Sequence, residues 1–139
     1  MNALKELEEI RKRKKELETL EKETLNPVLT NFDNLLLIQE WFEYLASQKE
    51  NFPKSSSIEY RQRYLFIVAL LYSPGTLLGD SLIRGLRNRL AELFHISTYA
   101  VSHSLKSVWF YYCHYKDFKE DVDYIYSEIL FRIELHRLK

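Results

Sequence analysis

The stretch that decides the fold is RLAELFHISTYAVSHSLK, which runs from Arg89 to Lys106. Apolar residues recur in it at helical spacing, with Leu90 before the centre and Val101 after it. Ser97 lies between the two apolar groups and is a typical N-cap residue, because its hydroxyl can accept a hydrogen bond from a free N–H group of the first helical turn. The stretch therefore predicts two helices joined by a tight turn.

The composition is that of a packed protein with a wet surface. The chain has 139 residues, of which 46% are hydrophobic, 14% aromatic and 29% charged. Its single cysteine excludes an internal disulfide, and the sequence contains neither a signal-like segment nor a long uninterrupted apolar run. We therefore expect a cytoplasmic protein that does not associate with a membrane.

The formal net charge of zero hides an uneven distribution of charge along the chain. Residues 57–116 contain seven Lys or Arg against three Asp or Glu, whereas each flank carries two more acids than bases. The region around the opening stretch is therefore basic. A neutral total charge does not exclude a local site for a polyanion.

The first 25 residues predict a long charged helix, which ends at Asn26-Pro27 because proline disfavours a helical conformation in the residue before it. We expect two parts, an N-terminal helix at 1–26 and a helical domain at 27–139. A coiled coil with a second copy is one candidate role of the first part, and it is left open because Lys14 and Glu21 interrupt the heptad pattern. The apolar stripe of this helix consists of Leu4, Leu7, Ile10, Leu17 and Leu20.

The cluster RKRKK at Arg11–Lys15 has two interpretations. Five adjacent cations could contact nucleic-acid phosphates. However, consecutive helical residues point in all directions around the axis, and glutamates flank the cluster on both sides. We favour a solvated helix face.

Three further helices are predicted in the domain, and no segment has the alternating pattern of a strand. They are expected in NLLLIQEWFEYLASQ from Asn34, IEYRQRYLFIVALLY from Ile58 and EDVDYIYSEILFRIELHRL from Glu120. The nearly continuous apolar run from Tyr64 to Tyr72 is expected at the centre of the core. The fold class predicted from the sequence is all-α.

The segment between residues 73 and 86 contains all three glycines, and its secondary structure has two interpretations. One interpretation is a loop with a short helix that begins at Asp80. The other is a single longer helix that reaches Phe94 with Gly85 inside it. The glycines do not form a phosphate-binding loop, because no Gly-Lys-Ser/Thr sequence follows them.

The stretch VWFYYCHYKDF, from Val108 to Phe118, continues the second helix of the pair. Its side chains are expected to form an aromatic seam in the core. Stacking on single-stranded bases is the alternative, and we disfavour it because such a role needs an open basic surface. The residues assigned to the seam are Val108, Trp109, Tyr111, Tyr112 and Tyr115.

From Arg87 onward the chain resembles the helix-turn-helix unit of DNA-binding proteins, over about residues 87–106. Leu90-Ala91 occupies the apolar and small positions of the first helix, and Val101 occupies the position that holds the second helix on the first. The sequence departs from the family twice: His95 replaces the usual turn glycine and would need a positive φ, and Ser104 replaces an apolar residue. We expect the neighbouring Leu105 to supply the missing contact.

The resemblance implies an all-α protein that binds double-stranded DNA through the second helix, as a transcription regulator or a phage-type or mobile-element DNA-recognition factor. It also implies a homo-oligomer, either a dimer or a ring, because such proteins usually double their contacts by symmetry. The residues it assigns to DNA binding are Arg84, Arg87, Arg89, Ser97, Thr98, Tyr99, Ser102, His103 and Lys106.

Two alternatives stay open. The chain could be a DNA-packaging ring subunit similar to small terminase subunits, or an all-α assembly or adaptor protein that does not bind DNA. We expect no enzyme, since the sequence lacks a recognisable nucleophile, catalytic His or paired-carboxylate arrangement. We expect no metal site, because no Cys or His pair has the spacing of metal ligands. We also expect no cofactor and no small-molecule substrate.

Overall fold

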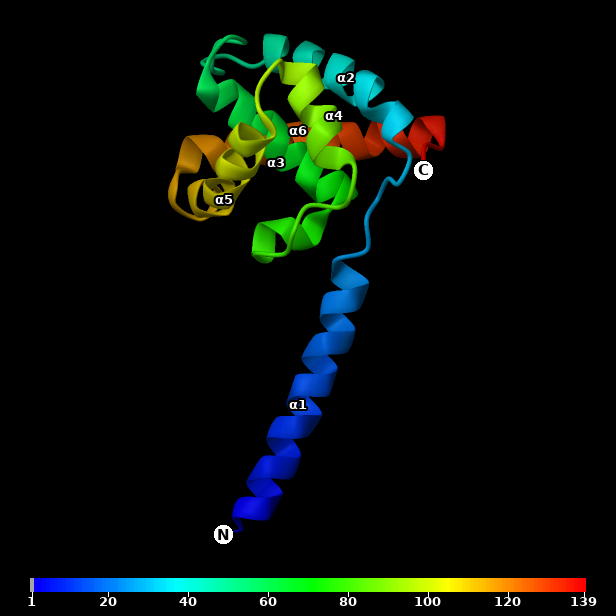
Figure 1. Ribbon diagram of the computed structural model, residues 1–139, viewed down its shortest axis with the longest axis vertical. Coiled ribbons are helices and arrows are strands. Elements are labelled where there is room, and N and C mark those ends of the chain that lie inside the picture. The colour runs from blue at the N-terminus through cyan, green and yellow to red at the C-terminus, as the bar shows by residue number, and fades with distance from the viewer. Residues whose placement is uncertain (1) are drawn as a thin grey trace.

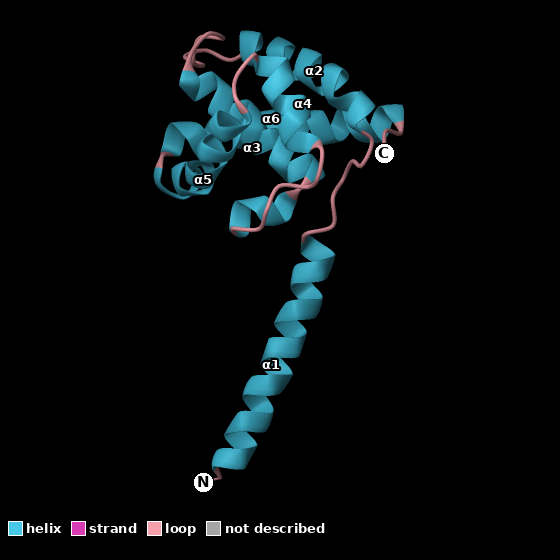
Figure 2. Cartoon of the chain, viewed as in Figure 1, coloured by secondary structure: helices cyan, strands magenta, loops and turns pink. Residues whose placement is uncertain are grey.

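Six α-helices and two short 3₁₀-helices make up the computed structural model, which describes residues 2–139 (Figure 1). Figure 2 shows only loops and turns between the helices of the described chain, and no strand. The elements are α1 (Ala3–Thr24), η1 (Phe32–Asn34), α2 (Leu35–Gln48), α3 (Ile58–Tyr72), η2 (Pro74–Leu78), α4 (Leu86–Phe94), α5 (Thr98–His114) and α6 (Lys116–His136). The all-α class predicted from the sequence is confirmed.

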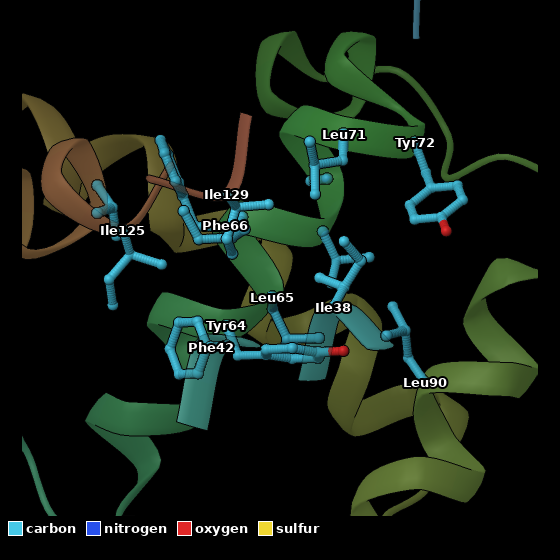
Figure 3. Packing of buried hydrophobic residues seen from close by; sticks show 14 of the residues in the cluster. Ile38, Phe42, Tyr64, Leu65, Phe66, Leu71, Tyr72, Leu90, Ile125 and Ile129 are labelled. Carbon is cyan, nitrogen blue, oxygen red and sulfur yellow. The ribbon is translucent and has the colours of Figure 1, made fainter. Parts of the chain in front are cut away.

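Helix α3 lies at the centre of the core, because apolar side chains cover nearly its whole circumference. Each residue from Tyr64 to Tyr72 except the half-buried Leu70 is at most 1% exposed, so the predicted burial of this run is confirmed. Figure 3 shows Tyr64 beside Phe42, and the two rings meet edge to face with centroids 5.1 Å apart. Such aromatic pairs add to the stabilisation that comes from burial alone.

Helix α6 forms another wall of the core, and its predicted apolar face is confirmed. Val122, Ile125, Ile129 and Ile133 are at most 5% exposed. The face packs against α2, α3 and α5. These contacts hold both ends of the domain together.

A buried ion pair joins α3 to α6, and the sequence pattern did not reveal it. The Nε atom of Arg63 lies 2.7 Å from Oδ2 of Asp121, and both side chains are below 10% exposed. The second carboxylate oxygen, Oδ1, lies 2.7 Å from Nζ of Lys49. The guanidinium also donates to the carbonyl of Glu59 and lies over the ring of Phe118. The buried carboxylate is therefore fully partnered, as a buried charge must be.

Helix α1 extends away from the other helices (Figure 1). It has 22 residues, and its N-terminus is capped by Asn2, whose side chain accepts from the N–H group of Leu4. Every one of its residues is exposed in the described chain, including Leu7 at 61% and Leu17 at 64%. The predicted helix is confirmed, and its apolar stripe is open to solvent.

The segment from Pro74 to Gly85 differs from both interpretations of the sequence. It forms η2 and then a loop, and α4 begins only at Leu86, so Asp80 does not begin a helix. Gly79 at φ +104° and Gly85 at φ +90° adopt left-handed conformations, which a continuous helix cannot contain. Gly85 also lies close to the ring of Phe32, which leaves little room for a side chain.

None of the helices formed by residues 2–139 has both the length and the apolar character that are needed to span a lipid bilayer.

Candidate nucleic-acid interface

A tight turn at residues 95–97 joins α4 to α5 at the point that the sequence predicted. His95 adopts φ +54° and ends α4, so the expected positive φ is confirmed. The N–H group of Ile96 donates to the carbonyl of Ala91 across 3.0 Å, which satisfies a carbonyl that the helix end leaves free. Ile96 is half-buried and holds the turn against the core.

Ser97 caps the N-terminus of α5. Its Oγ atom accepts a hydrogen bond from the N–H group of Ala100 at 3.0 Å, as predicted for an N-cap serine. The cap fixes the residue at which α5 begins. It therefore also fixes which of the following side chains point outward.

The two helices pack through the residues that the sequence assigned to their contact. Leu90 and Ala91 of α4 are buried, as is Val101 of α5. Figure 3 shows Leu90 pointing into the core from α4. Leu105 is buried as expected, and Ser104 is buried beside it at 8% exposure, so the small hydroxyl residue takes up an inward position itself.

The opposite face of α5 is open to solvent. Thr98, Tyr99, His103 and Lys106 are exposed, and Ser102 is half-buried at the edge of this face. The ring of Tyr99 is 74% exposed and stacks on that of His103, with the planes 14° apart and the centroids separated by 5.8 Å. One side of α5 thus carries these five predicted contact residues together. We call this surface, formed by Thr98, Tyr99, Ser102, His103 and Lys106, the outward face of α5.

A hollow of about 320 Å³ lies beside the outward face of α5. Arg87 from α4 and both Ser102 and Lys106 from α5 line it. Residues of η2 and of the loop that follows also line it, including Asp80 and Ser81. The hollow places two cations and three hydroxyl residues around one space, together with a single carboxylate, that of Asp80. The sequence assigned no role to the loop residues, because it left the structure of this loop open.

Arg84 and Arg89 do not line this hollow. Arg84 is exposed in the loop before α4. Arg89 projects from α4 toward η1, where its Nη1 atom lies 4.0 Å from Oδ1 of Asp33 and where it lines a separate hollow with Leu36. Both partners of this ion pair are largely exposed, so it contributes little to stability. The structure therefore divides the three arginines between different parts of the surface.

The outward face of α5 continues into aromatic residues, and here the predicted core seam is partly wrong. Val108 is buried and both Tyr111 and Tyr112 are half-buried, but Trp109 is 40% exposed and Tyr115 is 54% exposed. Phe110 is also exposed, at 53%. The helix is too long for its last turns to be covered on all sides by α3 and α6. The spacing of seven residues from Ser102 to Trp109 was the signal that places the indole on the open side.

The segment that contains α5 carries no negatively charged side chain. No Asp or Glu occurs in the sequence between Glu92 and Asp117, a segment that contains all of α5. Lys106 lies in the middle of α5, and His95, His103 and His114 occur along the same segment. An extended face without carboxylates does not repel a polyanion.

No protein-family model matches the chain, and no significant match is found among curated proteins or solved structures.

Proposed function

We propose that the chain binds duplex DNA, with α4 and α5 acting as a helix-turn-helix unit. The first turns of α5 then lie in the major groove, and α4 lies across the DNA backbone. The observation that carries the proposal is the convergence of Arg87, Ser102 and Lys106 on one hollow, beside a helix face that has no acidic residue. Two cations at one edge of a recognition helix are suited to anchoring it on phosphates.

The contact residues divide into two groups by chemistry. Thr98, Tyr99, Ser102 and His103 carry hydrogen-bonding groups on the exposed side of α5, where they can reach base edges. Arg87 and Lys106 anchor the helix through phosphate contacts, which fix its position but read no sequence. Ser97 acts first as the helix cap, and its role in DNA binding is to set the position of the helix.

Arg84 and Arg89 have a secondary role in this proposal. They lie outside the hollow, and Arg89 is paired at long range with Asp33. We assign them to the DNA backbone that flanks the groove. Substituting either one is expected to weaken binding less than substituting Arg87 or Lys106.

The proposal includes a second copy of the chain. A single recognition helix buries too little surface for tight specific binding, so two-fold pairing of helix-turn-helix units is the usual solution. Helix α1 is the element suited to pairing, because its leucines at 4, 7, 17 and 20 are all more than half exposed. An isolated amphipathic helix gains stability when it covers such a stripe with a partner helix.

The test is a titration of fluorescent duplex DNA by fluorescence anisotropy at several salt concentrations. The wild type, Arg87→Ala and Lys106→Ala are compared with Lys54→Ala, which removes an exposed cation from the loop between α2 and α3. Circular dichroism checks the folding of each variant. Log affinity is expected to fall linearly with log salt, with a slope that is reduced by about one in each of the first two variants.

The alternatives predict different results in the same experiment. An assembly or adaptor protein would show no binding at low salt, or binding that is insensitive to Arg87 and Lys106, and either result would overturn the proposal. A packaging ring would bind as a large oligomer with little preference among sequences, which sedimentation and competition with unrelated duplexes would reveal.

A further inference from the structure

The indole of Trp109 is a surface ring whose plane is fixed by the protein. It stacks on Tyr112 with a centroid distance of 5.4 Å and an interplanar angle of 15°. Tyr112 in turn stacks on the buried ring of Phe66, with a centroid distance of 5.1 Å and an angle of 13°. The Tyr112 hydroxyl also donates to Asp123 and accepts from Lys119. Three nearly parallel rings therefore run from the core to the surface and end at a side chain that is 40% exposed.

A fixed and exposed aromatic plane suits a ligand that stacks. Because Tyr112 covers one side of the indole, the exposed area belongs to its remaining surface. No rotamer entropy is lost when a flat ligand settles on a ring that is already held in place. Every nucleic-acid base presents such a flat π-face, and base–aromatic stacking is largely independent of sequence.

The position of Trp109 along α5 excludes it from the duplex groove that the proposed function assigns to this helix. Trp109 lies eleven positions after Thr98, which at about 1.5 Å per residue is roughly 16 Å of helix. In the helix-turn-helix docking mode the N-terminal residues of the recognition helix contact the base edges, and the straight helix diverges from the curved groove beyond its first turns. When the first turns of α5 lie in the groove, Trp109 therefore lies beyond the phosphate backbone, next to the DNA rather than within it.

The charge along α5 around Trp109 favours an anionic partner over a neutral one. Lys106 precedes it by one helical turn and lines the hollow with Arg87. The absence of Asp and Glu from residues 93–116 extends across both parts of α5. A cation beside an exposed aromatic ring is the arrangement by which proteins hold single strands, with the cation on the phosphate and the ring on the base.

We infer that Trp109 stacks on an unpaired DNA base, so that the preferred ligand is a duplex that continues into a single strand. The inference rests on the proposed function, because α5 must occupy the duplex groove for Trp109 to meet the adjoining strand. Lys106 then holds the phosphate at the junction. The neighbouring Phe110, 53% exposed and packed on His114 at 4.1 Å between centroids, provides a second ring for the following base.

The experiment compares three labelled ligands of matched length: a blunt duplex, the same duplex with a single-stranded extension, and the single strand alone. Affinities are measured by anisotropy for the wild type, Trp109→Ala and Trp109→Phe. Phe131→Ala is the matched control, since this exposed aromatic residue lies on α6. We expect the extension to tighten wild-type binding at least about fivefold, which is the lower end of the measured effect of stacking one base.

Trp109→Ala should abolish the gain from the extension and leave the affinity for the blunt duplex unchanged. Trp109→Phe should keep part of the gain, and Phe131→Ala all of it. A Trp41→Phe variant leaves Trp109 as the only one of the two tryptophans in the chain, so its fluorescence reports stacking directly. Quenching by the extended duplex but not by the blunt one is expected.

Each other outcome has a definite meaning. Equal affinity for blunt and extended duplexes overturns this inference and leaves the proposed function standing. Binding to the single strand with no contribution from the duplex, or no binding to any of the three ligands, overturns both. Self-association that depends on protein concentration and disappears in Trp109→Ala would identify the aromatic surface as an interface between copies, which also overturns the inference.

Discussion

Arg63 of α3 and Asp121 of α6 are 58 positions apart in the sequence and lie 2.7 Å apart between Nε and Oδ2, inside the core. Lys49 reaches the other oxygen of the same carboxylate. Both α3 and α6 also pack against α5. The ion pair helps to hold α3 and α6 together as the support on which α5 is packed.

Removing one partner of this pair should be costly. Asp121→Ala leaves the buried guanidinium of Arg63 without its carboxylate and is expected to lower the free energy of unfolding by about 3–5 kcal/mol. Urea denaturation measures the change. Glu128→Ala is the control, because it breaks a partly exposed i,i+4 pair with Arg132 and should cost less than about 0.5 kcal/mol. A similar small loss for both variants would show that the buried pair does not stabilise the fold.

The left-handed residue at the turn gives a test of the α4–α5 connection. His95 has φ +54°, where a side chain other than glycine is strained, and its own side chain is exposed. His95→Gly should therefore be more stable than His95→Ala by about 1 kcal/mol in urea denaturation. Equal stability of the two variants would contradict the left-handed turn. DNA affinity should change little in either variant.

Substitutions at Ser97 separate its role as a helix cap from the proposed DNA contact. Ser97→Ala removes the acceptor for the Ala100 N–H group and should cost about 1 kcal/mol of stability. Ser97→Asp keeps a capping oxygen and adds a favourable charge at the helix N-terminus, so stability should be retained. The same carboxylate would face DNA phosphates and should weaken binding more than the alanine does. Retained affinity in Ser97→Asp would place the DNA away from the start of α5.

Alkaline pH should weaken the fold through its buried tyrosines. Burial, reinforced by the nearby Asp33, raises the pKa of Tyr72 to about 12, and its hydroxyl donates to the carbonyl of Asn31 at 2.8 Å. The folded state favours the protonated phenol. Its contribution is therefore complete below the unfolded pKa of about 10 and is lost as the pH rises through about 12.

Urea denaturation of the wild type and Tyr72→Phe at neutral pH and at several values above pH 10 measures this effect. The variant should be less stable at neutral pH by about 1 kcal/mol, because it lacks the hydrogen bond, but should lose less stability as the pH rises. Some loss should persist, since burial also raises the pKa of Tyr60 and Tyr64. Parallel losses in the two proteins would contradict a role for Tyr72, and the exposed Tyr44→Phe is the control.

Self-association through α1 should respond to salt in the opposite direction to DNA binding. In a parallel pair in register, the basic cluster Arg11–Lys15 of one copy lies beside the same cluster of the other copy. An antiparallel pair that aligns Leu7 with Leu20 also brings the two basic clusters together. Screening of this repulsion should strengthen the oligomer as salt rises, whereas DNA binding weakens. Sedimentation velocity on the protein without DNA measures the fractions of monomer and oligomer at each salt concentration. The double variant Leu7→Ser/Leu17→Ser should be monomeric with an unchanged domain, and persistence of its oligomer would show that α1 is not the contact.

Local signals in the sequence predicted much of the architecture. The apolar run at Tyr64–Tyr72, the stop at Asn26-Pro27 and the cap at Ser97 each depend on neighbouring residues alone, and the structure has all three. The loop after Pro74 was not predicted, because two glycines in left-handed conformations interrupt a pattern that is compatible with a helix. The burial of Asp121 depends on a partner 58 positions away. The exposure of Trp109 depends on how far α3 and α6 cover the end of α5.

The candidate site was predicted in its composition but not in its grouping. Lys106, Ser102 and Arg87 lie around one hollow, which the sequence did not predict. Arg89 points instead toward Asp33, because residues 87 and 89 of a helix are about 200° apart around its axis. Asp80 and Ser81 also line the hollow, and this was not predicted because it depends on the path of the loop between η2 and α4.

The central claim is that the outward face of α5 lies against duplex DNA, and cleavage of the DNA from a chelate placed on that face tests it most directly. Cys113 is the single cysteine of the chain, so a Cys113→Ser background allows an iron chelate to be attached at one chosen position. We compare Ser102→Cys on α5 with Lys54→Cys in the loop between α2 and α3, at protein concentrations that saturate the duplex. Strand cleavage from position 102 well above that from position 54 is the predicted result. Equal cleavage from the two positions, or none from position 102 while the DNA is bound, would contradict it.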